Sequence, residues 1–144
     1  SNDLPNAETQ YHEINSGVGV IGQPLDAVVD KVNFIKIDVE GMEPEVLRGS
    51  SSLIDRWKPI IFIEINKKAL GDHKYKRSDI EHFFKKKKYH IYRVEGGKLN
   101  KLFSLNQSVF MNVLAVPFGT EVVATKPFPY LIKQIKRKIM MMVS

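Results

Sequence analysis

The stretch VNFIKIDVEGMEPEVLRGS, residues 32–50, decides the fold expected of this chain. It opens with a predominantly apolar run, 32–37, without the regular polar alternation of a half-buried strand, so we expect a strand buried on both faces. The run ends abruptly in a cluster of carboxylates that begins with Asp38 and Glu40. A charge at the end of a buried strand is costly unless it has a partner or a ligand.

The residues around this strand predict a strand–helix–strand unit. LDAVVDKV, 25–32, predicts a short helical turn ahead of the strand. Pro44 suits a first helical turn, and apolar residues at helical spacing predict an amphipathic helix over 44–57. IIFIEI, 60–65, predicts a second buried strand. Two buried strands joined through a helix are typical of a parallel pair with a right-handed crossover.

The next part of the chain predicts a loop, a helix and two more strands. Residues 67–77 form an expected basic loop, and a Ser78–Glu81 capping box opens the helix that follows. YHIYRV, 89–94, and VFMNVLAV, 109–116, predict strands, and the Gly-rich turn 95–98 favours an antiparallel pair at a sheet edge. The predicted fold class is α/β, with two parallel strands, a crossover helix and a C-terminal antiparallel strand pair.

Composition and charge indicate a globular domain followed by a basic tail. The chain has 144 residues, 43% of them hydrophobic, and no cysteine, which excludes disulfides and thiolate chemistry. We see no signal peptide and no apolar stretch of about 20 residues, so we expect a cytoplasmic protein. We expect a domain over 1–121 and a basic amphipathic tail over 122–144.

The net charge of +6 comes mainly from that tail, which carries five bases and no acid. The remainder of the chain is close to neutral, and its only basic patch is Lys67 to Lys88, so nucleic-acid binding is not favoured. Residues 129–144 place apolar side chains on one helical face and bases on the others. This pattern suits a helix on an anionic membrane surface, and equally a helix docked on the domain or on a partner.

GVGVIG, residues 17–22, matches the glycine pattern G-x-G-x-x-G of dinucleotide-binding proteins. That fingerprint needs a strand before the glycines and a helix after them. Here the preceding residues are polar, Pro24 follows at once, and the spacing to Asp38 is short. We therefore interpret the glycines as a flexible, structural loop.

The carboxylates at the strand ends are the candidate site. In open α/β sheets, ligands bind beyond the carboxyl ends of the strands. Asp38 ends the first strand, and Glu64 and Asn66 end the second, so these side chains converge if the strands are neighbours. Lys36 projects to the same side as Asp38 and is available to pair with either acid. We favour a functional role for Asp38, while a structural Lys36–Glu64 ion pair stays open.

Two further acids, Glu43 and Glu45, lie where the helix begins. Acidic side chains there are stabilised by the positive end of the helix dipole. We therefore interpret both as helix-capping residues without a role in the site.

Residues 25–66 resemble the signature of FkbM-type S-adenosylmethionine-dependent methyltransferases. The family pattern has Leu-Asp, then Lys-Ile-Asp-Val-Glu-Gly, a Glu, Val-Leu-x-Gly, and Lys-Pro ahead of an apolar strand that ends in Glu. The matching residues are Leu25-Asp26, Lys36 to Gly41, Glu43, Val46-Leu47, Gly49, Lys58-Pro59 and Glu64. Pro44 is a mild departure that a helix start absorbs.

The resemblance implies a partial Rossmann-like methyltransferase sheet. Residues 32–37 and 60–65 resemble the fourth and fifth strands of that fold, and 89–94 with 109–116 the final antiparallel pair. The family's Asp-x-Gly-x-x-x-Gly cofactor loop has no counterpart here, so we expect the C-terminal half of the fold, as a fragment or a shortened member. An open sheet edge at 32–37 would then need a partner from 1–24 or from a second copy, which predicts self-association.

The resemblance also implies a function, namely transfer of a methyl group from S-adenosylmethionine to a hydroxyl of a sugar or natural product. Asp38 and Glu64 are the expected catalytic residues, and Asp38, Glu40 and Gly41 the expected cofactor-binding residues. A divalent cation held by Asp38, Glu64 and Asn66 is a weaker hypothesis. The alternative is a non-catalytic methyltransferase-like module that binds a partner or a membrane surface.

Overall fold

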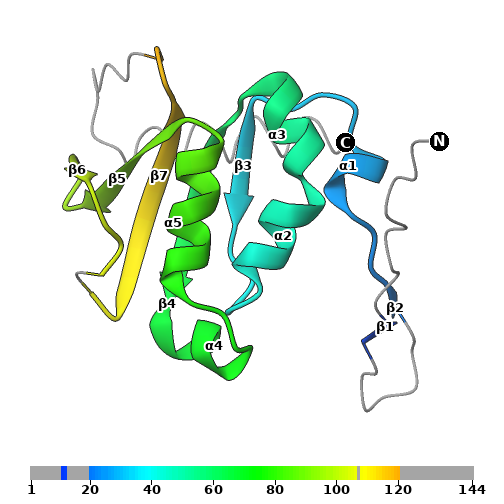
Figure 1. Cartoon of the computed structure of the whole chain (residues 1–144), viewed down its shortest axis with the longest axis horizontal. Coiled ribbons are helices and arrows are strands. Elements are labelled where there is room, and N and C mark those ends of the chain that lie inside the picture. The colour runs from blue at the N-terminus through cyan, green and yellow to red at the C-terminus, as the bar shows by residue number, and fades with distance from the viewer. Residues whose placement is uncertain (1–10, 13–19, 107, 121–144) are drawn as a thin grey trace.

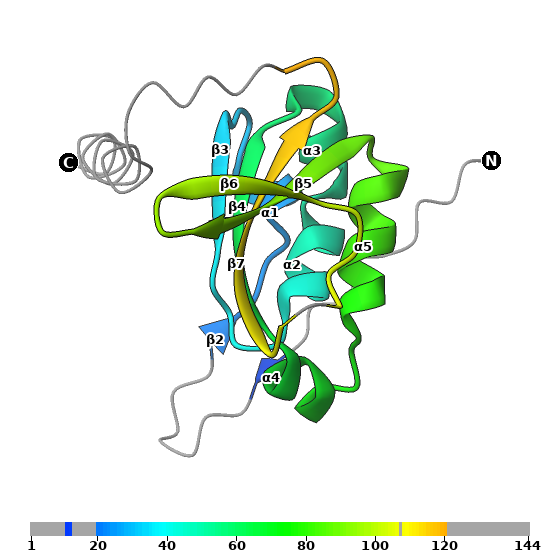
Figure 2. The same cartoon turned by 90° about the vertical axis from the view of Figure 1, so that its left-hand side faces the viewer.

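The structure is a computed structural model that describes residues 11–12, 20–106 and 108–120. Its main body is a mixed α/β unit with a five-stranded sheet, and Figure 1 shows the strands and helices in sequence colours. The helices α2 (Glu43–Gly49), α3 (Ser51–Trp57) and α5 (Arg77–Lys86) lie together on one face of the sheet, as Figure 2 shows from the side.

The sheet has the strand order β3-β4-β7-β5-β6. β3 (Phe34–Ile37) and β4 (Ile60–Asn66) are parallel, and α2 and α3 connect them, which confirms the predicted strand–helix–strand unit. β7 (Phe110–Pro117) lies between β4 and β5 (Tyr89–Glu95) and is antiparallel to both. The antiparallel β5–β7 pair is therefore confirmed, but its placement at the edge is wrong.

The edge position belongs to β6 (Lys98–Leu102), which the sequence analysis missed. Gly96 and Gly97 have φ values of 55° and 77°, so they form a two-residue turn that pairs Glu95 with Lys98. The Gly-rich turn thus closes a β5–β6 hairpin, and the chain returns to the sheet centre only with β7.

The predicted helix 44–57 is two helices, α2 and α3, interrupted at Ser50. The side chain of Asp26, in α1 (Leu25–Val28), accepts hydrogen bonds from the backbone N–H groups of Ser52 (2.9 Å) and Leu53 (2.7 Å). These are amides of the first turn of α3, so a residue distant in sequence caps the second helix and stabilises the break.

Two details of the predicted basic loop and of the capping box are also wrong. The loop contains a helix, α4 (Lys67–Asp72). α5 begins at Arg77, and the Asp79 carboxylate accepts the hydrogen bond from the Lys76 N–H at 2.8 Å. Glu81 instead accepts from the Leu105 N–H at 3.1 Å, so it holds the loop after β6 and does not cap the helix.

The main core lies between the sheet and the helices. Its fully buried members include, on the strands, Ile37, Ile61, Ile63, Ile65, Val113 and Ala115 and, on the helices, Leu47, Ile54, Leu70, Ile80 and Phe84. The expectation that the first strand is buried on both faces is wrong, because on the face away from the helices Lys36 is exposed and Phe34 is only partly buried. β4 is buried on both faces at its centre, where Phe62 packs with Leu114 and Val116 on the opposite side of the sheet.

Within the described ranges, no strand pairs with the outer edge of β3. β1 (Tyr11–His12) and β2 (Val20–Ile21) pair antiparallel with each other in a separate two-stranded sheet. Residues 17–19 of the GVGVIG stretch, the tail 122–144 and its expected helix 129–144 lie outside the described residues, and Val20–Ile21 of that stretch form β2. Among the helices that the structure describes, none is long and apolar enough to cross a membrane.

Candidate active site at the carboxyl ends of β3 and β4

Asp38 and Glu64 lie at the same edge of the sheet, on either side of Lys36. The Lys36 Nζ is 2.8 Å from Asp38 Oδ2 and 3.7 Å from Glu64 Oε1. The strand register explains this arrangement. Lys36 lies opposite Phe62, so Asp38 and Glu64, each two residues further along its strand and on the same face of the sheet, also lie opposite each other. The two acids that the sequence analysis selected are thus brought together by adjacent parallel strands.

Lys36 is held in its charged form by these neighbours. Its pKa is raised above 10.5, chiefly by the hydrogen bond to Asp38; burial opposes this rise, and the charges of Asp38 and Glu64 add to it. The ammonium group therefore offsets part of the negative charge at this edge of the sheet.

A small hollow of about 10 Å³ lies between the strand ends and the loop after β3. It is lined by Asp38, Glu40, Glu43, Glu64, Asn66 and Phe110. Four of these six side chains are carboxylates, so the hollow is strongly acidic and about large enough for a water-sized group. An acidic recess of this kind suits a cationic group or a proton donor.

Glu43 lies in the first turn of α2, where a helix-capping residue was expected, and it also lines the hollow. Its side chain is only 1% exposed, and its Oε1 accepts a hydrogen bond from the Gly41 N–H at 3.0 Å. Its Oε2 is buried and has no hydrogen-bond partner among the described residues. A buried carboxylate oxygen without a partner is costly, which marks Glu43 as a functional candidate. Nothing in the local sequence separates it from Glu45, which bonds Arg48 and Tyr75 on the outside of α2.

The loop that carries Glu40 and Gly41 is fixed against α4. Glu40 has a φ of 48° and lies at the exposed rim of the hollow. Gly41 has a φ of 104°, and a Cβ there would lie 2.4 Å from the backbone oxygen of Ala69. Gly41 is thus required for close packing of this loop on α4, and its N–H orients the Glu43 carboxylate.

The oxygen of Asn66 is already used within the fold. It accepts hydrogen bonds from the N–H groups of Lys68 (3.1 Å) and Ala69 (3.5 Å) and so caps α4. Beside it, Asn112 pairs with Glu64 across β4 and β7, and its Oδ1 is buried without a partner in the described part of the chain. Among the residues described, no three His, Cys, Asp or Glu side chains form a group that could hold a metal ion.

The acidic hollow fits one part of S-adenosylmethionine. Asp38, Glu43 and Glu64 complement the ammonium and sulfonium charges of its methionine end. A volume of about 10 Å³ does not accommodate the adenosine. The hollow therefore accommodates at most the ammonium group of the cofactor, and the remainder of S-adenosylmethionine requires a surface outside it.

Polar side chains thus gather beyond the carboxyl ends of β3 and β4, which is the place where open α/β sheets bind their ligands. The family model of the methyltransferase FkbM domain matches residues 2–91, so the chain belongs to the FkbM methyltransferase family. The match includes α2, β4 and the loop that carries Glu40 and Gly41, and it extends beyond residue 66 into β5. No curated protein and no solved structure matches the chain.

Proposed function

We propose that this chain acts in S-adenosylmethionine-dependent methylation of a hydroxyl group on a sugar or natural product. The observation that carries the proposal is the meeting of Asp38, Glu43 and Glu64 in one hollow, in a chain of a methyltransferase family. The sheet supports it as well, because β3 and β4 are a parallel pair joined through helices and β7 is antiparallel to both of its neighbours, features that the family resemblance implies for the C-terminal half of the fold.

The proposed chemistry assigns a separate task to each carboxylate. S-adenosylmethionine, when bound, supplies an electrophilic methyl group. Glu64, about 29% exposed, would accept the proton of the acceptor hydroxyl as the hydroxyl oxygen bonds to the methyl carbon, while the bond from that carbon to the sulfonium sulfur breaks and the cofactor leaves as a neutral thioether. Asp38, with Glu40 and the Gly41 segment, would orient the cofactor's charged end, and the Oε2 of Glu43 would accept a hydrogen bond from its ammonium group.

Calorimetric titration with S-adenosylmethionine tests cofactor binding. We expect saturable binding by the wild-type chain and a loss of about tenfold in affinity for Asp38→Asn, because one charge-assisted contact disappears. Asp72→Asn, an exposed acid of α4 away from the hollow, is the matched control and should bind as wild type does. A folded wild-type chain that binds no S-adenosylmethionine would contradict the proposal and support a non-catalytic module instead.

Methyl transfer itself is tested by incubating the chain with labelled S-adenosylmethionine and a panel of sugars and alcohols. We expect Glu64→Gln to lower the rate of transfer by a factor on the order of 10² to 10⁴, as removal of a general base does. Equal rates for wild type and Glu64→Gln would show that Glu64 is not the base.

We also propose that the protein works in the cytoplasm and that residues 129–144 bring it to an anionic membrane surface. The support is the basic, amphipathic pattern of that segment. Co-sedimentation with phosphatidylglycerol vesicles should be lost when residues 122–144 are removed. Vesicle binding that is unchanged by the truncation would contradict this role.

A further inference from the structure

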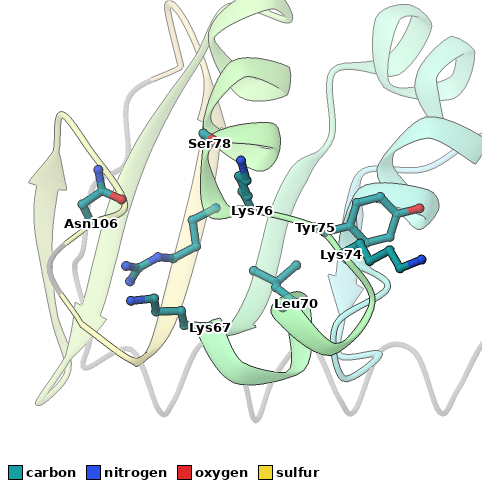
Figure 3. A pocket seen from close by; sticks show the side chains of 9 residues that line it. Lys67, Leu70, Lys74, Tyr75, Lys76, Ser78 and Asn106 are labelled. Carbon is teal, nitrogen blue, oxygen red and sulfur yellow. The ribbon is translucent and has the colours of Figure 1, made fainter.

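A second and much larger pocket, of about 570 Å³, lies between α4 and the beginning of α5. Its polar lining consists of Lys67, Lys74, Lys76, Arg77, Ser78 and Asn106, with Leu70 and Tyr75 between them (Figure 3). In Figure 3 the Lys67 side chain extends toward the loop that carries Asn106, while Lys74 and Tyr75 lie at the opposite end. The pocket therefore has the size of a small-molecule site.

The charge of this pocket is of one sign. Four of its lining residues are cations, and none is a carboxylate. No ion pair involves Lys67, Lys74, Lys76 or Arg77 within the ranges that the structure describes, although Arg77 donates a hydrogen bond to the Ser108 carbonyl. Concentrated positive charge in a concave surface attracts a compact anion, and Arg with Lys is the usual pair for phosphate.

The neutral residues of the pocket suit the uncharged part of such a ligand. Leu70, only 1% exposed, belongs to the core and forms an apolar floor. Tyr75 is held in place because its hydroxyl contacts Glu45 and Arg48 of α2. The pocket thus has a fixed aromatic ring at one end and the hydrogen-bonding groups of Ser78 and Asn106 elsewhere in its lining, and both kinds of group are suited to binding a polar ring such as a sugar.

Consecutive residues at the end of β4 line the acidic hollow and the basic pocket. Asn66 lines the hollow, and the next residue, Lys67, lines the pocket. The Gly41 loop packs directly on Ala69 of α4, so the two sites share one rigid junction. Both sites therefore lie near the carboxyl end of β4, and α4 borders the pocket and packs against the loop of the hollow.

We propose that this pocket binds the phosphate group of a small phosphorylated molecule of sugar-phosphate type, with Lys67 and Arg77 as its principal cations. That the sugar phosphate is the acceptor of the methyl group rests on the function proposed above. That the pocket binds phosphate does not depend on that function. A recess of this volume fits a sugar phosphate better than it fits the flat surface of a bilayer.

The test is titration of the full chain with glucose 1-phosphate, followed by calorimetry or by amide NMR shifts of residues 67–78. We expect saturable binding, no binding of glucose, and at least tenfold weaker binding by Lys67→Gln and by Arg77→Gln. Lys101→Gln, an exposed lysine of β6, is the matched control and should bind as wild type does.

Because Arg77 also contacts Ser108, Arg77→Gln could weaken binding by disturbing the fold. A third variant therefore changes the charge of the pocket without removing a contact of the fold. A Cβ added at Gly71 meets no atom within 4 Å, so Gly71→Glu places a carboxylate at the pocket without a clash. We expect this variant to fold normally by circular dichroism and to lose binding, whereas Gly71→Ala keeps it.

Four outcomes would overturn the inference. The folded wild type does not bind glucose 1-phosphate, or it binds only to vesicles of phosphatidic acid. Alternatively, the Lys67, Arg77 and Gly71→Glu variants bind glucose 1-phosphate as tightly as wild type does, or Lys101→Gln loses as much affinity as they do. Parallel titrations with S-adenosylmethionine keep the two proposals separate. Loss of either kind of binding alone contradicts only the proposal that depends on it.

Discussion

At the scale of single residues, the candidate site depends on the contact between Gly41 and Ala69. The φ of 104° at Gly41 is unfavourable for any residue with a side chain, and a Cβ would lie 2.4 Å from the Ala69 backbone oxygen. Glycine is therefore needed here both for its conformation and for its lack of a side chain.

We predict that Gly41→Ala lowers the free energy of unfolding by about 3 kcal/mol, since backbone strain and a backbone clash add together. Urea denaturation measures this loss. Gly71→Ala is the control, because space around Gly71 is open and alanine favours a helix; it should raise the free energy of unfolding by about 0.5–1 kcal/mol. Similar stabilities for the two variants would contradict the close packing of the loop on α4.

Glu43 allows a test that separates function from stability. We predict that Glu43→Gln raises the free energy of unfolding by about 1–3 kcal/mol, because a buried acid with an unpartnered oxygen becomes a neutral amide beside Asp38 and Glu64. We expect the same variant to weaken S-adenosylmethionine binding, as is common where function opposes stability. Thermal denaturation and calorimetry measure the two effects.

Glu45→Gln is the matched control for that change, because Glu45 lies on the outside of the same helical turn. It should leave S-adenosylmethionine binding unchanged. A destabilised Glu43→Gln variant with normal binding would assign Glu43 a purely structural role.

At the scale of elements, an ion pair joins α3 to the end of α5. The Lys87 Nζ is 2.5 Å from Asp55 Oδ2, and Lys58 lies 3.5 Å from the other oxygen. The hydrogen bond from Lys87 is the main cause that lowers the pKa of Asp55 below 3.8. The pair therefore stabilises the fold while Asp55 is ionised.

We predict a pH-dependent effect of Asp55→Asn. The folded-state pKa of Asp55 is lowered, so its contribution is complete above 3.8 and is lost as the pH falls through the folded value. Wild type should be more stable than Asp55→Asn at neutral pH, and the difference should vanish in strong acid. Urea denaturation across this pH range measures it, and a difference that persists in strong acid would contradict the assignment.

The outer edge of β3 is the element from which we propose self-association. No strand of the described residues covers it, and an open edge presents unpaired backbone groups. We predict that sedimentation velocity shows a dimer at high concentration and that hydrogen exchange at residues 34–37 slows with it. Exchange in β6, the other edge, is the internal control and should not change. A monomer at all concentrations would contradict this prediction.

At the scale of the whole molecule, β4 is the centre of the fold. Ile63 is fully buried and lies opposite both Ile37 of β3 and Val113 of β7. We predict that Ile63→Ala lowers the free energy of unfolding by about 3–4 kcal/mol in one cooperative transition. Leu99→Ala, in the half-buried edge strand β6, should cost less than about 1.5 kcal/mol. Comparable losses would show that the sheet is not organised around β4.

Much of the fold could be predicted from local patterns. The runs 32–37 and 60–65, with an amphipathic segment between them, were enough to predict two parallel strands and their connection, and the FkbM resemblance carried by residues 25–66 agrees with the matched family. The break at Ser50 could not be predicted, because Asp26 caps α3 from another part of the chain. The insertion of β7 between β4 and β5 is likewise a long-range choice.

In the candidate site, too, some features could be predicted from the sequence and others depend on the tertiary structure. The sequence by itself determined that Asp38 and Glu64 lie at the ends of two apolar runs, because the pattern along a strand is a local property. The pairing of β3 with β4, which brings the two acids together, was decided by the tertiary structure. Only the tertiary structure decided that Glu43 is buried in the hollow, that the Asn66 oxygen caps α4, and that Lys67 and Arg77 line one pocket. These facts depend on which surfaces exclude water together, and burial is a property of the assembled chain.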